Sequence, residues 1–309
     1  MALTKAEQQR ANQLIFEQLQ DRGLEKQAAD AINEFTRIRI REDGYSRRIM
    51  PFLQVSNDDL DRQLWTDKPV IIIDKEPNVP PAISVPYGTL PTNFYIRGPR
   101  YQVTFDRLLS PRAVKDMGEL RTWIMDIRQV IADNMIKDML AEEDSKFTSA
   151  VNTALIGQGS ITPTSGVAQW QAISGGITRD TQMDAFKVMP STPFHLEART
   201  VLVNNVTIYE YLKWGRDEVG GDLSQDLLRN GWTEREFMNR TWIITIKRDL
   251  VPDNTQFQFA DPKFIGKQFM LEDATMHLKR EYWMLSFFLF EEVGASIGHT
   301  GGLVRVDFQ

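Results

Sequence analysis

Residues 116–157 carry the longest regular pattern in this sequence and read DMGELRTWIMDIRQVIADNMIKDMLAEEDSKFTSAVNTALIG. Their apolar side chains recur at three- and four-residue spacing, which predicts an α-helix. Asp116 and Glu119 resemble a capping box at its start, and the pattern ends before a glycine. The predicted helix, about residues 118–155, is about 54 Å long, roughly three times the mean for globular proteins. A helix kinked at residues 142–145 is the alternative, and the lack of a sustained heptad pattern disfavours a coiled coil.

Before this helix the chain is rich in proline, with seven of its fourteen prolines inside residues 69–99. Strand-like runs at residues 70–73 and 93–96 flank them, and a third run at 101–105 alternates with period two. The pattern predicts a long β-hairpin whose far part has little core of its own. Because a two-stranded arm is marginal in isolation, we expect it to pack on a neighbouring subunit.

The N-terminal residues 1–42 are predicted to form two helices. In the second, Leu24, Ala28, Ile32 and Phe35 fall on one face, and the remaining positions are mostly polar or charged. A stripe this thin does not make a core by itself, so the segment needs a surface to lie on.

The second half of the chain has a mixed pattern. Residues 156–182, rich in Gly, Ser and Thr, are predicted to be loops, and residues 298–302 to be a hairpin turn. The predicted regular elements are buried strands at 200–203 and 241–246, a helix at about 207–214, a long strand pair from 277 to 290 and a last strand at 303–306. The fold class is therefore α+β.

Composition excludes several classes of function. The 309 residues contain no cysteine and three histidines far apart, which excludes thiolate chemistry and disulfides and disfavours a zinc site. The net charge of −6 argues against a free-standing nucleic-acid-binding protein. No apolar run approaches the roughly 20 residues of a membrane span.

Candidate chemical sites are few. Residues 142–144 are Glu, Glu and Asp, but neighbouring residues on a helix diverge, so a solvated charged face is predicted. Asp222 and Asp226 lie one turn apart, with too few further ligands for calcium. His195 and Ser191 lack a nucleophile-elbow motif, and no phosphate-binding Gly-Lys-Ser/Thr occurs. We predict no catalytic residue, no cofactor site and no metal site.

The order of these parts resembles the major capsid protein of tailed bacteriophages, the HK97-like fold that encapsulins also use. The resemblance is architectural and covers nearly the whole chain. It implies an N-terminal arm at 1–55, an extended loop at 56–110, a peripheral domain with a long spine helix at 111–194, an axial domain at 195–262, and the peripheral domain's returning strands at 263–309.

The same resemblance implies a structural subunit and not an enzyme. Such chains self-assemble into hexamers and pentamers of an icosahedral head that encloses double-stranded DNA, here through weak contacts because the chain is acidic. The implied partners are scaffold, portal and decoration proteins, with no membrane, and the implied location is the virion capsid, assembled in the host cytoplasm. An encapsulin-like shell protein, a tail or portal component and an α+β enzyme are the alternatives.

The candidate residues for contact between subunits are all charged or aromatic. Arg47 and Arg48 on the arm, and Arg97 and Arg100 on the loop, are predicted to form ion pairs with a neighbour's acidic helix face. Tyr101 joins the loop cluster. The predicted axial tip, with Asp222 and Asp226, would surround the five- or six-fold axis of a capsomer.

Overall fold

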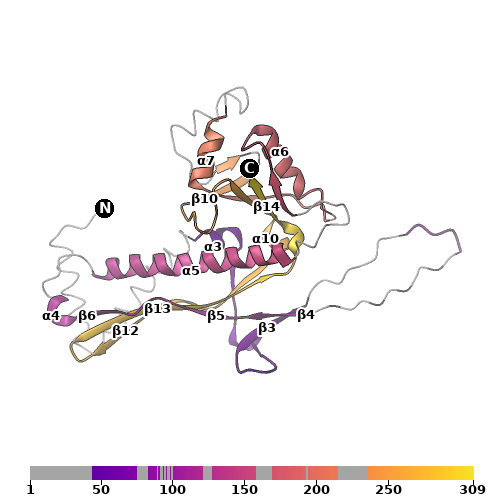
Figure 1. Ribbon diagram of the computed structural model, residues 1–309. Helices are drawn as coiled ribbons and strands as arrows, with labels where there is room; N and C mark the ends of the chain where they lie inside the picture. The colour runs from indigo at the N-terminus through magenta and orange to yellow at the C-terminus, as the bar shows by residue number, and fades with distance from the viewer. Residues whose placement is uncertain are drawn as a thin grey trace.

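A computed structural model describes residues 44–74, 83–88, 90, 93, 95, 98, 100–120, 127–157, 169–192, 194–214, 235–237 and 239–309. The chain is α+β, as predicted, and the described residues form three sheets. In Figure 1 the long helix α5 (Ile127–Gly157) lies between a rounded upper lobe and two long strands below it, β12 (Gly266–Glu281) and β13 (Met284–Ile297). The hairpin of β3 (Pro69–Asp74) and β4 (Arg100–Thr104) points away from this body.

The upper lobe is built on a mixed six-stranded sheet with the order β7-β14-β11-β8-β10-β9. Strands β8 and β10 run parallel, with helix α7 (Asn205–Leu212) following β8 directly. Every residue of β8 and β11 is buried, so the centre of the sheet is covered on both faces. The strands are β7 (Trp170–Ile173), β8 (Thr200–Asn204), β9 (Arg235–Phe237), β10 (Arg240–Thr245), β11 (Thr255–Phe259) and β14 (Leu303–Phe308).

Helices cover both faces of this sheet. Helix α6 (Arg179–Val188) begins at a capping box between Thr178 and Thr181, and α7 begins at Asn204, whose side chain accepts a hydrogen bond from the backbone of Thr207. Side chains from α6, α7 and alternate positions of β8 form one apolar cluster, which contains Phe186, Val201, Val203, Ile208, Tyr211, Trp214 and Trp242. The other face turns toward α5.

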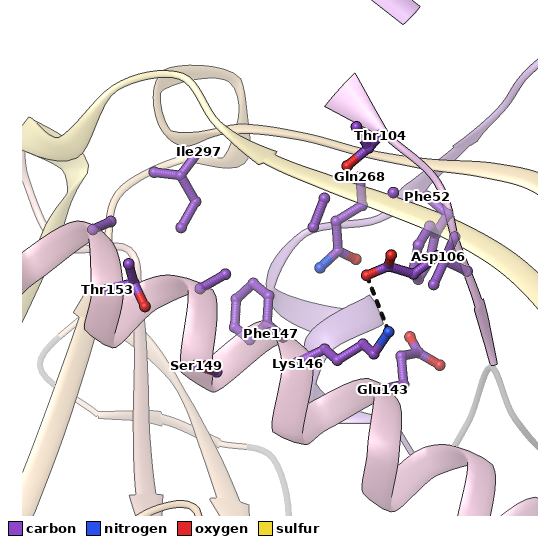
Figure 2. A pocket seen from close by; sticks show the side chains of 15 residues that line it. Phe52, Thr104, Asp106, Glu143, Lys146, Phe147, Ser149, Thr153, Gln268 and Ile297 are labelled. Atoms are coloured by element: carbon purple, nitrogen blue, oxygen red, sulfur yellow. Dashed lines mark hydrogen bonds and ion pairs between the residues drawn. The ribbon is translucent and has the colours of Figure 1, made fainter. Parts of the chain in front are cut away.

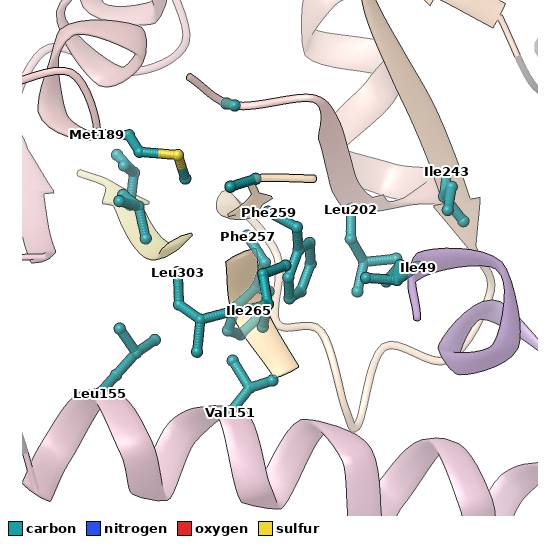
Figure 3. Packing of buried hydrophobic residues seen from close by; sticks show 14 of the residues in the cluster. Ile49, Val151, Leu155, Met189, Leu202, Ile243, Phe257, Phe259, Ile265 and Leu303 are labelled. Carbon is teal, nitrogen blue, oxygen red and sulfur yellow. The ribbon is translucent and has the colours of Figure 1, made fainter. Parts of the chain in front are cut away.

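The largest core lies between this second face and α5. Figure 3 shows Val151 and Leu155 of α5 directed toward Leu303 and Ile265, because a four-residue spacing places them on one face of the helix. On the other side, Ile49 of the short helix α3 (Tyr45–Ile49) belongs to the same cluster as Leu202 and Ile243.

The lower sheet is formed around the long hairpin of β12 and β13. Strand β1 (Phe52–Gln54) pairs with β12, while β5 (Asp106–Leu109) and β6 (Ala113–Asp116) both pair with β13. A second apolar cluster here contains Met135, Ile136, Met139 and Leu140 of α5 together with Leu285, Phe287 and Leu289 of β13. Helix α5 therefore contributes to two cores. Its earlier turns face the lower sheet, and its later turns face the upper lobe.

The third sheet is small. Strand β2 (Asp61–Arg62) pairs with β3, and β3 pairs with β4. Its cluster contains the buried residues Val55, Ile71 and Val103 together with Phe269 of β12. The remaining short elements are the 3-10 turns η1 (Asn57–Asp59) and η2 (Thr300–Gly302) and the helices α4 (Met117–Leu120) and α10 (Pro262–Ile265).

The predicted long helix agrees with α5 at its C-terminal end and is unbroken through residues 142–145. Two parts of the prediction lie outside the described residues: residues 121–126 of the long helix, and the two helices of residues 1–42.

Two predictions about local structure were wrong. Residues 156–182 were predicted to be loops but hold β7 and the start of α6, and residues 298–302 do not close a hairpin but carry the chain from the lower sheet to the six-stranded sheet.

The six-stranded sheet joins strands from different predicted domains. Residues 111–194 and 263–309 are predicted to form one domain and 195–262 another. Strands β7 and β14, from the first set, pair with each other, and β14 also pairs with β11 from the second. Periodicity predicts that a strand exists but does not identify its partner, and the domain boundaries stay a prediction.

Candidate assembly interface and buried ionic cluster

Arg47 does not lie on the outside of the molecule, where the predicted contact with a neighbour would place it. It is buried, and its guanidinium donates from Nε to both carboxylate oxygens of Glu143 at 3.0 and 3.1 Å and from Nη2 to Glu291 Oε2 at 2.9 Å. Both carboxylates belong to its own chain. Arg47 therefore holds α3 onto α5 and β13 within one subunit, which removes it from the candidates for contact between subunits.

The other described candidates lie at the surface or close to it. Arg48 is exposed on α3. Arg100 is exposed at the start of β4 and pairs with Asp74 across the hairpin, with an N–O distance of 2.7 Å. Tyr101, the next residue, is half-buried beside the small cluster of the third sheet. Arg97, Asp222 and Asp226 lie outside the described residues, so contact between subunits at these positions stays a prediction.

A second buried acid is next to Glu143 in the sequence but meets a different cation. Asp144 accepts a hydrogen bond from the backbone of Ser46 at 3.0 Å and pairs with Lys247 Nζ at 2.5 Å. Glu143 and Asp144 thus pair with different cations, Arg47 and Lys247. The predicted solvated face was wrong: Glu143 and Asp144 are buried, since α3 covers this part of α5.

The cluster shifts the pKa values of its members. Burial raises the pKa of the Glu291 carboxyl to about 8, with a further rise from the nearby charge of Glu143 and a partial reduction by Arg47. Burial also raises the pKa of Glu143, against the lowering effect of Arg47. Burial alone would lower the pKa of Arg47. The two carboxylates, Glu143 and Glu291, outweigh this effect and raise the pKa, so Arg47 stays charged.

A cavity of about 660 Å³ lies beside this cluster, between α5 and the long hairpin. In Figure 2 Phe147 and Lys146 of α5 line one side, with Gln268 of β12 opposite. Its charged groups are already paired: Lys146 contacts Asp106 at 3.1 Å, and Glu143 is held by Arg47. The lining therefore offers no pair of groups available for acid–base chemistry.

Apolar side chains are exposed on the described residues between β3 and β4. We call Ile83, Val85, Tyr87, Leu90 and Tyr95 the loop patch; all five are exposed, and Tyr87 and Leu90 almost completely so. Gly88, beside Tyr87, has a φ of +87°, a conformation that favours glycine and turns the chain at this point. Leu64 and Trp65, between β2 and β3, are also exposed. Several large exposed apolar side chains in one segment are typical of a contact surface.

Metal and membrane sites can be judged only within the described ranges. There, no group of three or more His, Asp or Glu side chains is placed to hold a metal ion. Over the same ranges, none of the helices combines the length and the apolar character that crossing a membrane requires.

Comparisons with known proteins identify the fold. No protein-family model matches the chain, and no curated protein matches it. Among solved structures, it is similar to a chain of Microbacterium phage Oxtober96, with 12% identity and a TM-score of 0.59 over 86% of this chain and 91% of that one. The mature capsid of bacteriophage PhiM1 gives 9% identity and a TM-score of 0.58 over 86% and 87%.

A third structure has the widest coverage of these three. The virus-like particle from Pyrococcus furiosus matches 91% of this chain and 99% of its own, with 11% identity and a TM-score of 0.53. The fold is that of the HK97-like capsid proteins. At these identities the likeness establishes the HK97-like fold and leaves individual residue roles to the geometry.

The buried cluster was missed from the sequence, although one signal for it existed. From Phe287 to Val293 the buried positions of β13 alternate, and Glu291 continues the series Leu285, Phe287 and Leu289 on the core face of the HK97-like lower sheet. An acid in register with core residues indicates a buried charge that needs a partner. No comparable signal exists for Arg47, because its partners lie 96 and 244 residues away in the sequence.

Proposed function

We propose that this chain is a capsid subunit that self-assembles into the hexamers and pentamers of an icosahedral phage head enclosing double-stranded DNA. The proposal makes the chain structural and not enzymatic. Its fold is that of capsid shell proteins, and the charged groups lining the described cavity are already paired. The location is the virion capsid after assembly in the host cytoplasm.

The loop patch carries the proposal. A hairpin of two or three strands is marginal alone, yet β3 and β4 lead away from the body toward residues whose apolar side chains face solvent. Burying such side chains stabilises by about 1.5–3 kcal/mol each. A neighbouring copy of this chain can supply the missing surface, and a closed shell supplies such a neighbour to every subunit.

Other partners follow from the same assignment. Scaffold, portal and decoration proteins would contact the shell, and the packaged DNA would touch its inner wall weakly because the net charge of the chain is −6. Residues 195–262, proposed as the axial domain, would reach the capsomer axis through a tip that contains Asp222 and Asp226.

An encapsulin-like shell without a phage genome is the second candidate. The observation in its favour is the match that covers 99% of the chain of the virus-like particle from Pyrococcus furiosus. The nucleic-acid content of purified particles separates the two: a phage head formed in infected cells contains genomic double-stranded DNA, and an encapsulin-like shell does not.

The first test is electron microscopy of the purified recombinant chain, alone and co-expressed with its genomic neighbours. We expect closed spherical particles. Rings or tubes would instead support a portal or tail component, and small soluble oligomers under both conditions would contradict a shell protein.

A matched pair of variants tests the loop patch itself. Tyr87→Asp should abolish particles while leaving the subunit folded, because a charge then replaces an exposed apolar contact. The control is Tyr209→Asp, at a tyrosine of α7 that is also exposed. Equal particle loss in both variants, or normal particles from Tyr87→Asp, would remove the loop patch from the argument.

The charge reversal Arg97→Glu is expected to reduce particle yield in the same way.

A further inference from the structure

The cluster around Arg47 joins three segments that are far apart in the sequence. Arg47 comes from α3, Glu143 from the middle of α5 and Glu291 from β13. The side chains of all three are at most 6% exposed. Ser46 adds a hydrogen bond to Glu143 at 3.0 Å. The contacts fix α3, and with it the start of β1, onto both the long helix and the lower sheet.

The charges in this cluster do not balance. Two buried carboxylates, Glu143 and Glu291, share one guanidinium, so the group carries one excess negative charge if both are ionised. Glu291 Oε2 accepts from Arg47, but Glu291 Oε1 is buried with no hydrogen-bond partner among the described residues. An ionised carboxylate oxygen buried in this way is strongly disfavoured. A proton on the pair restores neutrality.

Among the residues that the structure describes, the neighbouring charged groups do not supply the missing cation. On α5, Asp144 is paired with Lys247, which follows β10, and Lys146 is paired with Asp106 of β5. On β13, the next residue Glu292 pairs with Arg107 of β5. On β12, Asp273 makes the pKa of Glu291 higher still. On α3 itself, Arg48 is exposed and Tyr45 donates its hydroxyl to the backbone carbonyl of Asp144.

We propose that Glu143 and Glu291 share one proton and that this proton locks residues 44–54 onto the body of the subunit, so that its loss loosens them. When the proton leaves, two carboxylates repel each other around one guanidinium in a site that excludes water. The segment that can yield is the short one: α3 has five residues, of which Tyr45 and Ile49 pack in the main core, whereas α5 and β13 have 31 and 14 residues and many more core contacts.

The pH dependence follows from the direction of the shift. Burial raises the pKa of Glu291 from 4.5 to about 8, so the folded state binds a proton that the unfolded state has released. The stability from this group is fully present below about pH 4.5, falls as the pH rises, and is lost above about pH 8. Since the two acids interact, they titrate as a pair.

The shared proton therefore controls how firmly residues 44–54 are attached to the rest of the subunit. Residues 44–54 include β1, which pairs with β12 in parallel from Phe52 to Gln54. Loosening them would weaken, at alkaline pH, the attachment of the proposed arm, residues 1–55, to the rest of the subunit. The inference concerns a single folded subunit, so it can hold or fail independently of the proposed shell.

Two measurements on the full chain test it. Infrared spectroscopy at about pH 6 should show the carbonyl band of a buried protonated carboxyl, absent in Glu291→Gln and present in the control Glu292→Gln. Hydrogen exchange, corrected for the intrinsic effect of pH, should show the protection of residues 45–54 falling up to about tenfold per pH unit between about pH 5 and 8. Glu291→Gln should remove that dependence, and Glu292→Gln should keep it.

The control is a partly buried carboxylate one residue away that has its own arginine. Absence of the protonated band from the wild-type chain, or protection of residues 45–54 that does not change with pH, would overturn the proposal. If Glu291→Gln does not fold, Glu143→Gln neutralises the other member of the pair and should flatten the same pH dependence. If Glu143→Gln folds but keeps the pH dependence of the wild-type chain, the proposal is also overturned.

Discussion

The runs Val70-Ile71-Ile72-Ile73 and Thr200-Val201-Leu202-Val203 look alike in sequence, but they end in very different surroundings. In β8 every residue is buried, whereas in β3 Ile72 is 46% exposed. Strand β8 lies in the middle of six strands with helices on both faces, and β3 belongs to a three-stranded hairpin beside one small cluster. Similar β-forming sequences thus yield a self-sufficient sheet in one place and an incomplete one in the other.

The largest expected effect compares two tryptophans in these regions. Trp242 of β10 is completely buried and packs edge-on against Tyr211 at 5.1 Å, while Trp65 beside β3 is 88% exposed. Trp242→Ala should lower the free energy of unfolding by about 3–5 kcal/mol, and Trp65→Ala by less than about 0.5 kcal/mol. Urea denaturation of the subunit measures both. Similar values for the two variants would break the comparison.

The next effect concerns the junction between the regions. Arg47→Ala leaves Glu143 and Glu291 buried without a cation, which should cost about 3–5 kcal/mol of unfolding free energy. The loss should shrink toward about pH 5, because protonation of the carboxylates removes the unpaired charge. Denaturation at several pH values measures it, with the exposed neighbour Arg48→Ala as the control. A loss that grows toward acid pH would contradict the described ion pairs.

A smaller effect should separate local from global stability. Ile71→Val removes one methylene from the small cluster of the hairpin, and Ile243→Val removes the same group from the main core. Each should cost about 0.5–1.5 kcal/mol. For Ile71→Val we expect faster hydrogen exchange mainly in β3 and β4, and for Ile243→Val across the upper lobe. Faster exchange throughout the molecule from Ile71→Val would show that the hairpin is part of the main cooperative unit.

The smallest effect belongs to an exposed ion pair. Arg100 and Asp74 are each 71% exposed, so Arg100→Ala should change the free energy of unfolding by less than about 1 kcal/mol. A double-mutant cycle with Asp74→Ala isolates the pair. A coupling energy above about 2 kcal/mol would mean that the hairpin is held by its own ion pair and needs no neighbour.

Local patterns predicted what depends on local sequence. The end of α5 at Gly157 and the strands β8 and β10 followed from spacing of apolar residues, and the sparse core of the hairpin followed from its prolines. These features depend on residues a few positions apart. The order of parts along the chain was also sufficient to indicate the capsid fold.

Long-range partners were not predictable in the same way. Strand β14 lies between β7 and β11, about 135 and 50 residues away in sequence, and no pattern in its six residues identifies them. Glu143 was predicted to face solvent because its partner Arg47 lies on another helix. A buried charge depends on what covers it, and that cover is a property of the tertiary structure.

The position of β14 also affects the order of events during synthesis. It is the last strand of the six-stranded sheet to leave the ribosome, yet it occupies an inner position, so among the described strands β7 has no partner until residues 303–308 have been made. Until then one edge of β11 is open, and open edges pair with other chains. On a polysome, where several ribosomes translate one message, the upper lobe therefore closes only after translation of these residues, and neighbouring nascent chains present an unpaired edge to one another in the interval.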